Sequence, residues 1–221
     1  MKKPSADERA VAAREGRAEI RERASRFLAF ANPVSRPDEA AQAVARLRRQ
    51  YHDATHVAFA WKIGSGGTAA RRSSDAGEPS GTAGKPIAAA IESAGISDVV
   101  VAVVRYFGGT KLGTGGLSRA YREAADGAIS AAGSRIIREM SLVVVTCPYD
   151  RLGALRRLVR PPQVTLAGES FEASPIVKLE VARSRLPALR AALEEARLSY
   201  EVLDALCHPE ERSDEGSAPR R

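Results

Sequence analysis

The chain has 221 residues, of which 44% are hydrophobic and 28% are charged, and its formal net charge is +7. This composition is that of a globular protein with a packed core, and no apolar run approaches the roughly 18 residues that a membrane-spanning helix needs. The N-terminus carries charges where a signal peptide is apolar, so we expect a cytoplasmic protein without a membrane partner. The positive balance favours acidic partners, nucleic acid among them.

The N-terminal half of the chain alternates predicted strands and helices. Residues 1–18 are rich in Ala, Arg and Glu with charges of both signs, which predicts a frayed or helical N-terminal extension. The elements expected after it are a strand within 19–31, a helix over 37–50, a strand over 55–63, a flexible loop over 64–74, a helix over 85–94 and a strand over 99–104. The last strand has six apolar residues without alternation, which indicates burial on both faces.

A glycine-rich turn follows that strand within Arg105-Tyr-Phe-Gly-Gly-Thr-Lys-Leu-Gly-Thr-Gly-Gly-Leu-Ser-Arg-Ala-Tyr-Arg122. From Leu117 onward the apolar residues recur with a helical period. A helix start leaves backbone N–H groups unpaired and carries a positive dipole end, and glycines let a partner approach the backbone. We therefore predict an anion- or partner-binding surface that consists of Arg105, Lys111, Gly113, Gly115, Gly116 and Arg119. The alternative is a tight turn that packs the helix onto the sheet and binds no ligand.

The chain after Gly133 is poorer in glycine and follows the order β-α-β-β-α-β. The predicted elements are a strand over 142–146, a helix over 150–159, strands over 163–172 and 175–182, a helix around 186–193 and a strand over 199–206. This order is that of a ferredoxin-like domain. We therefore expect an α+β protein with one domain over 19–136, a second over 137–206, and a disordered polar tail over 207–221.

Nucleotide and metal motifs fail in detail. A Walker loop needs Ser or Thr where Gly84-Lys-Pro86 has proline, and a dinucleotide fingerprint needs glycine where the chain has Ser118. His52 and His56 are four residues apart, but the second begins a predicted strand, so the two side chains diverge. Cys147 ends an apolar strand and is interpreted as a core thiol. We expect neither a metal nor a cofactor.

The polar residues before the helix at 85–94 permit two interpretations. Asp75 and Glu78 are either a catalytic carboxylate pair, or they pair with Lys85 and Arg105 and hold the glycine loops in place. We favour the structural interpretation, because two carboxylates without a neighbouring nucleophile or metal ligand define no reaction. His56 is either a hydrogen-bonded structural group or a base.

Three blocks together resemble the YigZ/IMPACT family: Asp53-Ala-Thr-His56, Ser74-Asp-Ala-Gly-Glu-Pro-Ser-Gly-Thr-Ala-Gly-Lys-Pro86, and the stretch from Arg105 to Tyr121. The resemblance covers residues 19–132. The residues that support these motifs are His56, Asp75, Glu78, Gly81, Thr82 and Lys85. The family commonly has two acidic residues before Gly77, whereas the second is Ala76 here, so a role that needs both carboxylates is in doubt.

The resemblance implies a first domain with a ribosomal-protein-S5-domain-2-like two-layer α/β sandwich, a fold shared with small-molecule kinases of the GHMP type. It implies a second, ferredoxin-like domain similar to the last domain of elongation factor G. Eukaryotic relatives regulate translation. The first hypothesis is therefore a non-enzymatic protein of the translation apparatus that binds RNA or a ribosome-associated protein. The alternatives are an enzyme that acts on a phosphorylated small molecule, and a protein–protein adaptor without nucleic acid.

Overall fold

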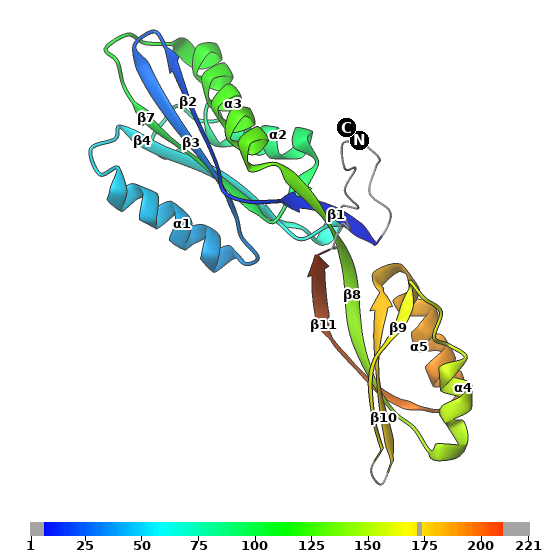
Figure 1. Ribbon diagram of the computed structural model, residues 1–221. Helices are drawn as coiled ribbons and strands as arrows, with labels where there is room; N and C mark the ends of the chain where they lie inside the picture. Colours follow the sequence, from blue (N-terminus) through cyan, green and yellow to red (C-terminus); the bar gives the residue numbers. More distant parts are fainter. Residues whose placement is uncertain (1–6, 172–173, 210–221) are drawn as a thin grey trace, which may run out of the picture. The chain divides into compact units, whose positions relative to one another are not determined.

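The computed structural model describes residues 7–171 and 174–209 and shows an α+β protein that forms two compact units (Figure 1). The N-terminal unit spans residues 10–135. The C-terminal unit contains the described residues from 136 onward together with residues 7–9. Residues 7–9 therefore belong with the second unit, which the sequence did not indicate. Whether either unit folds alone stays a prediction.

A five-stranded antiparallel sheet forms the centre of the N-terminal unit, in the order β2-β3-β7-β4-β5. The strands are β2 (Gly16–Glu22), β3 (Ser25–Pro33), β7 (Val99–Tyr106), β4 (His56–Ile63) and β5 (Ala70–Ser74). A short parallel pair joins β1 (Glu8–Ala12) to β6 (Ile96–Ser97) through Ala10 and Val11. A 3₁₀ turn, η1 (Gly66–Thr68), precedes β5.

Helices cover both faces of this sheet (Figure 1). On one face, α1 (Pro37–Gln50) packs Val44 and Leu47 against Phe30 and Val100. The other face carries α2 (Gly84–Ala94) and α3 (Gly113–Ala132). The predicted two-layer sandwich is therefore wrong for this unit, which has three layers. The reason lies in the central strand, whose residues 99–104 are each at most 2% exposed and so need cover on both sides.

Two strands lie where the sequence predicted other structure. The extension expected to be frayed or helical contains β1 and the start of β2, and the loop expected at 64–74 contains β5. A tight turn joins β2 to β3, with Arg23 at φ 44° and Ala24 at φ 67°. Pairing with β3 therefore outweighs the helix preference of the Ala, Arg and Glu residues in β2.

The C-terminal unit contains β8 (Ser134–Thr146), η2 (Tyr149–Arg151), α4 (Leu152–Arg156), β9 (Val164–Phe171), β10 (Pro175–Ala182), η3 (Arg183–Arg185), α5 (Leu186–Glu195) and β11 (Ser199–Pro209). This is the predicted element order, although β8 starts eight residues earlier than expected and α4 ends before 159. The strands pair antiparallel in the order β11-β8-β10-β9. Cys147 lies in the core, and burial raises the pKa of its thiol. The predicted tail lies mostly outside the described residues.

Candidate functional site

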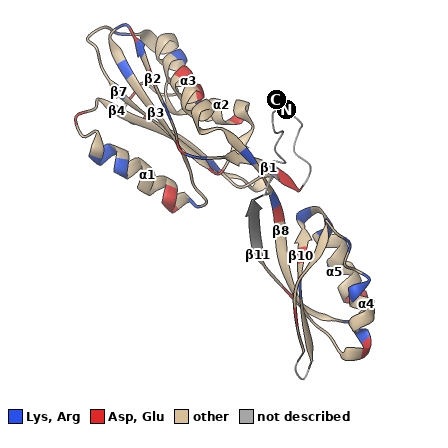
Figure 2. Cartoon of the chain, viewed as in Figure 1, with Lys and Arg blue, Asp and Glu red and all other residues tan. Residues whose placement is uncertain are grey.

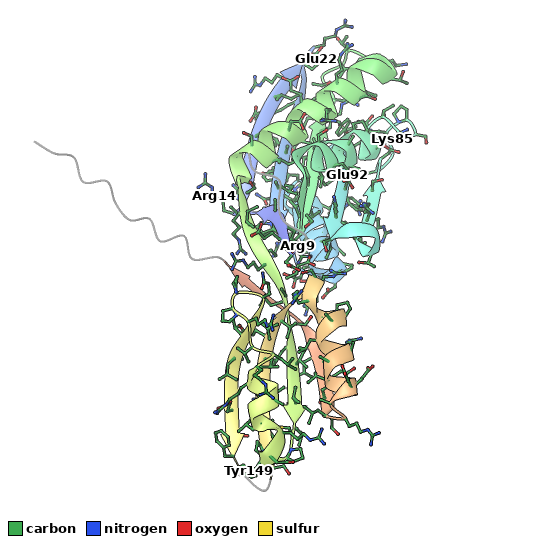
Figure 3. The ribbon with its side chains drawn as sticks, turned by 90° about the vertical axis from the view of Figure 1, so that its right-hand side faces the viewer. Arg9, Arg14, Glu22, Lys85, Glu92 and Tyr149 are labelled. Atoms are coloured by element: carbon green, nitrogen blue, oxygen red, sulfur yellow. The ribbon has the colours of Figure 1, made fainter. Side chains whose placement is uncertain are left out.

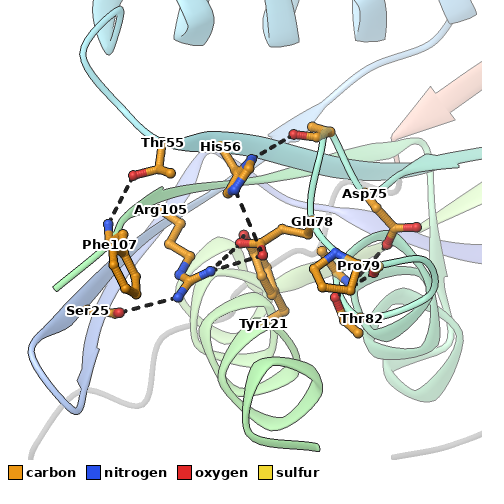
Figure 4. Close-up of polar contacts among 12 residues, drawn as sticks. Ser25, Thr55, His56, Asp75, Glu78, Pro79, Thr82, Arg105, Phe107 and Tyr121 are labelled. Carbon is orange, nitrogen blue, oxygen red and sulfur yellow. Dashed lines mark hydrogen bonds and ion pairs between the residues drawn. The ribbon is translucent and has the colours of Figure 1, made fainter. Parts of the chain in front are cut away.

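Arg105 is buried near the end of β7, the central strand of the sheet in the N-terminal unit. It is the penultimate residue of β7, and its backbone lies opposite Phe27 on β3 and His56 on β4. The residue is 5% exposed. Its Nη1 donates to both carboxylate oxygens of Glu78, at 2.7 and 2.9 Å, and Nη2 donates to Ser25 Oγ at 3.4 Å (Figure 4). Arg105 is thus already neutralised inside the protein.

Tyr121 completes this buried cluster from α3. Its hydroxyl donates to Oε1 of Glu78 at 2.7 Å, and its ring packs edge-on against Phe27. Burial, followed by the bond to this carboxylate, raises the pKa of Tyr121 far above its ordinary value. The hydroxyl therefore stays a donor, and the cluster balances one cation with one anion. This geometry supports the structural interpretation of Glu78 and Arg105.

His56 faces the cluster with one ring nitrogen fixed and the other open. Its Nδ1 lies 2.9 Å from the backbone carbonyl of Ala76. A carbonyl can only accept, so Nδ1 carries the hydrogen, and Nε2 of the neutral ring carries a lone pair. Nε2 lies 4.0 Å from Oε2 of Glu78, which is too long for a hydrogen bond. Gly77 holds this arrangement, because it has φ 90° and a Cβ there would lie 3.2 Å from Nδ1.

Asp75 lies beside the start of α2 and accepts three backbone hydrogen bonds. The donors are the N–H groups of Gly81 at 2.9 Å, Ala83 at 3.0 Å and Gly84 at 2.8 Å. Partial burial raises the pKa of Asp75, but these three donors outweigh it, so the pKa is lowered overall. The positive end of α2 therefore already holds an anion, which is the protein's own carboxylate.

The other motif residues of this loop have supporting positions. The Thr82 hydroxyl donates to the carbonyl of Pro79 at 2.7 Å, and Gly81 has φ 77°. Lys85 is exposed in the first turn of α2 (Figure 3). Among the described residues it forms no ion pair with Asp75. That part of the structural interpretation is wrong, because backbone N–H groups take the place of the lysine.

The start of α3 differs from that of α2. Among the described residues no side chain caps its first turn, which contains Gly113, Gly115 and Gly116. Lys111 and Arg119 are both exposed, and neither has an ion-pair partner within the described part of the chain. Lys111 therefore does not neutralise a carboxylate here, in contrast to Arg105.

A pocket of about 400 Å³ opens between the buried cluster and the start of α3. Its walls come from the start of β4, the loop before α2, the end of β7 and the first turns of α3. The lining residues are Thr55, His56, Glu78, Pro79, Arg105, Phe107, Lys111, Leu112, Gly113, Thr114 and Leu117. Five of the predicted residues thus meet in one place, while Gly115, Gly116 and Arg119 continue along α3.

The sequence reasoning missed Thr55, Phe107 and Tyr121. Thr55 Oγ1 accepts from the backbone N–H of Phe107 at 3.0 Å, which fixes the 45%-exposed phenylalanine at the pocket wall. Tyr121 could have been found from its place in the apolar stripe of a helix. A tyrosine there buries its hydroxyl, and a buried hydroxyl needs a hydrogen-bond partner.

The described residues contain no cluster of three or more metal-ligand side chains, and none of their helices has the length and hydropathy of a membrane span.

Comparison with known proteins defines the class of this unit. The family model described as the Impact N-terminal domain matches residues 23–129, which include β3, β7, the pocket and most of α3. An "IMPACT family member" of Haemophilus influenzae is 30% identical over 184 residues, which cover 81% of this chain and 89% of that protein. The chain belongs to the IMPACT family.

Other relatives agree with this assignment. The "IMPACT family member YigZ" of Escherichia coli is 31% identical over 176 residues, with 79% of this chain and 84% of that protein covered. An "IMPACT family member in pol 5'region" of Thermus thermophilus is 43% identical over 136 residues, which are 62% of this chain and 72% of that protein. A solved structure described only as a hypothetical protein shares the fold, with a TM-score of 0.61 and 24% identity over 93% of this chain and 99% of that one.

Proposed function

We propose that the protein binds RNA in the setting of translation, through the surface formed by Lys111, the first turn of α3 and Arg119. We call this the α3 surface. The observation that carries the proposal is the contrast between two neighbouring helix starts. Asp75 fills the start of α2, whereas among the described residues no side chain caps the start of α3, and two unpaired cations lie near it.

The chemistry of this surface suits a phosphate group. A helix start offers unpaired N–H donors and about half a positive charge, and Lys111 and Arg119 add formal charge. A Cβ at Gly115 would meet nothing within 4 Å besides the backbone of its own helix and its chain neighbours, so the backbone there is open to an approaching oxygen. The surface fits a chain of phosphates better than one isolated anion, because Lys111 and Arg119 lie eight residues apart.

The distribution of charge supports an acidic partner for the N-terminal unit. Residues 10–135 contain eighteen Lys and Arg against twelve Asp and Glu, so this unit holds six of the seven net positive charges. Figure 2 marks Lys and Arg positions on α1 and on α3, which cover opposite faces of its sheet. Excess positive charge attracts nucleic acid from a distance and supplies most sequence-independent binding.

The finer fold assignments belong to this proposal. The strand order β11-β8-β10-β9 supports a ferredoxin-like C-terminal unit, and the likeness of the N-terminal unit to a ribosomal protein domain stays a prediction. The link to translation rests on the family resemblance. A cytoplasmic location follows from the proposed partner.

The test measures the affinity for a fluorescent single-stranded RNA over a series of salt concentrations. Lys111→Glu and Arg119→Glu should each weaken binding and reduce the log–log salt slope by about 0.7. Arg48→Glu is the matched control, because Arg48 is exposed on α1, which covers the opposite face of the sheet. Unchanged binding in a folded Lys111→Glu, Arg119→Glu double variant would remove the α3 surface from consideration. Binding to a ribosomal protein and not to RNA would favour the alternative of a protein–protein adaptor without nucleic acid.

A second candidate is an enzyme acting on a phosphorylated small molecule, and the pocket favours it. A volume of about 400 Å³ lies in the range of about 300–1,000 Å³ typical of small-molecule sites. We nevertheless expect no ATP hydrolysis, because Asp75 occupies the helix start at Gly84-Lys85. Phosphate release by the wild type that disappears in Lys85→Ala would contradict this expectation and promote the enzyme.

A further inference from the structure

We propose that the 400 Å³ pocket binds one unstacked RNA base that carries an exocyclic amino group, such as cytosine, while its phosphate lies at the start of α3. This inference rests on the proposed function and names the group that the same site selects. It explains why an apolar pocket and a phosphate-binding surface share Lys111, Gly113 and Thr114 as walls. A nucleotide has the same two parts, a flat, largely apolar base and a charged phosphate.

Phe107 supplies a stacking platform. The residue is 45% exposed although it lines the pocket, and its backbone is fixed by Thr55. The guanidinium carbon of Arg105 lies 5.5 Å from the ring centroid, so one face of the ring is covered by a cation. The rest of the ring is free to stack on a base, which is how single-stranded RNA is usually held.

Two atoms at the inner end of the pocket, Nε2 of His56 and Oε2 of Glu78, can each accept a hydrogen bond from a ligand. Nε2 of His56 carries a lone pair in the neutral ring, because Nδ1 donates to Ala76. It faces Oε2 of Glu78 across 4.0 Å (Figure 4). That oxygen already accepts from Nη1 of Arg105 at 2.9 Å and, as a carboxylate oxygen, has a further lone pair, whereas Nε2 accepts no hydrogen bond from the described residues. One amino group has two hydrogens and can donate to both.

The bases differ at this point. Cytosine presents an amino group at C4, whereas uracil presents a carbonyl oxygen there. A carbonyl that faces Nε2 and Oε2 would add a third acceptor. Uracil's single ring N–H can satisfy only one of them. A donor–acceptor mismatch of this kind discriminates between bases by about 5- to 100-fold. Apolar walls formed by Pro79, Leu112 and Leu117 would exclude the water that could otherwise bridge the mismatch.

The experiment uses the same affinity measurement with fluorescent RNA and compares octacytidylate with octauridylate, two strands of equal length and charge. The wild type should bind octacytidylate at least 5-fold more tightly, with the same salt slope for both. His56→Leu should remove most of this preference without changing the slope. Phe107→Ala should weaken binding of both strands by about 5- to 100-fold, since stacking stabilises each bound base.

Tyr149→Ala is the control, because Tyr149 is an exposed aromatic residue of the other unit, and it should change neither affinity nor preference (Figure 3). Equal affinities for the two strands in the wild type would overturn the inference, and so would a Phe107→Ala variant that behaves like the control. In both cases, binding that still depends on Lys111 and Arg119 would leave the proposed function standing. Absence of any RNA binding would overturn both.

Discussion

Gly113 and Gly115 are two residues apart in the same helical turn, yet alanine should affect them in opposite ways. Gly113 has φ 71°, a conformation that costs an alanine about 1–2 kcal/mol. Gly115 lies within the helix, and a Cβ there would meet nothing within 4 Å besides the backbone of its own helix and its chain neighbours. Alanine in a helix is about 0.5–1 kcal/mol more favourable than glycine. Gly113→Ala should therefore lower the free energy of unfolding, and Gly115→Ala should raise it.

Urea unfolding followed by tryptophan fluorescence measures both effects in the intact protein. Trp61 is the single tryptophan of the chain and lies on β4, so the signal reports on the N-terminal unit. The midpoints of the two variants should move to opposite sides of the wild type, and their free energies should differ by about 1.5–3 kcal/mol. Equal slopes of the free energy of unfolding against urea concentration would show that both variants expose the same surface area on unfolding.

A measurement of RNA binding by Gly115→Ala distinguishes the effect of this residue on stability from its effect on function. The methyl group of Gly115→Ala points into the space proposed for a phosphate oxygen, so this variant should bind RNA more weakly although its fold is more stable. A more stable variant with unchanged RNA affinity would refute the close approach of phosphate to this turn. A less stable variant would refute the geometric argument itself.

Three further predictions concern the buried cluster and the two units. Glu78→Ala leaves Arg105 buried without its carboxylate and should cost about 3–5 kcal/mol in the same urea experiment, whereas Tyr121→Phe removes one donor and should cost about 1–3 kcal/mol; equal losses would contradict the ion-pair account. Because the pKa of Asp75 is lowered on folding, its contribution is full above the ordinary value of 3.8 and is lost as the pH falls through the folded-state value. The decline in stability in acid should therefore be shallower in Asp75→Asn, and an unchanged profile would assign the decline to other groups. Residues 10–135 expressed alone should unfold cooperatively by tryptophan fluorescence, and a fragment without such a transition would disprove an independent domain.

The sequence predicted best the elements with strong apolar periodicity. The helix expected over 37–50 is α1, and the helix expected over 85–94 is α2, which ends before Gly95 in the left-handed conformation. The unbroken apolar run of β7 correctly indicated burial on both faces, although the fold name drawn from the resemblance implied two layers. Edge strands were missed because their signal is weak. All five residues of β5 are polar or small and none is buried, so nothing in them alternates.

The pairings at the candidate site were predicted only in part. The favoured interpretation of the polar residues before α2 was that Asp75 and Glu78 pair with Lys85 and Arg105, and the structure confirms the contact between Glu78 and Arg105. Nothing in the sequence indicated that backbone N–H groups would donate to Asp75 in place of Lys85. Backbone donors become available only where a loop folds back onto a helix start, and that geometry depends on the positive φ values at 76, 77 and 81.

The long-range contacts of Arg105, the buried cation at the wall of the pocket, have a consequence for the order of folding during synthesis. Arg105 bonds to residues 27 and 80 positions away, and Tyr121 reaches back 43 positions to Glu78. Contacts this distant form only after the intervening chain has been closed into place. A nascent chain that ends before α3 has the arginine and its carboxylate but lacks the tyrosine that bonds to the carboxylate. The buried cluster beside the pocket can therefore be completed only after synthesis has passed residue 121, and chains that end at 112 and at 135 should differ in protease resistance accordingly.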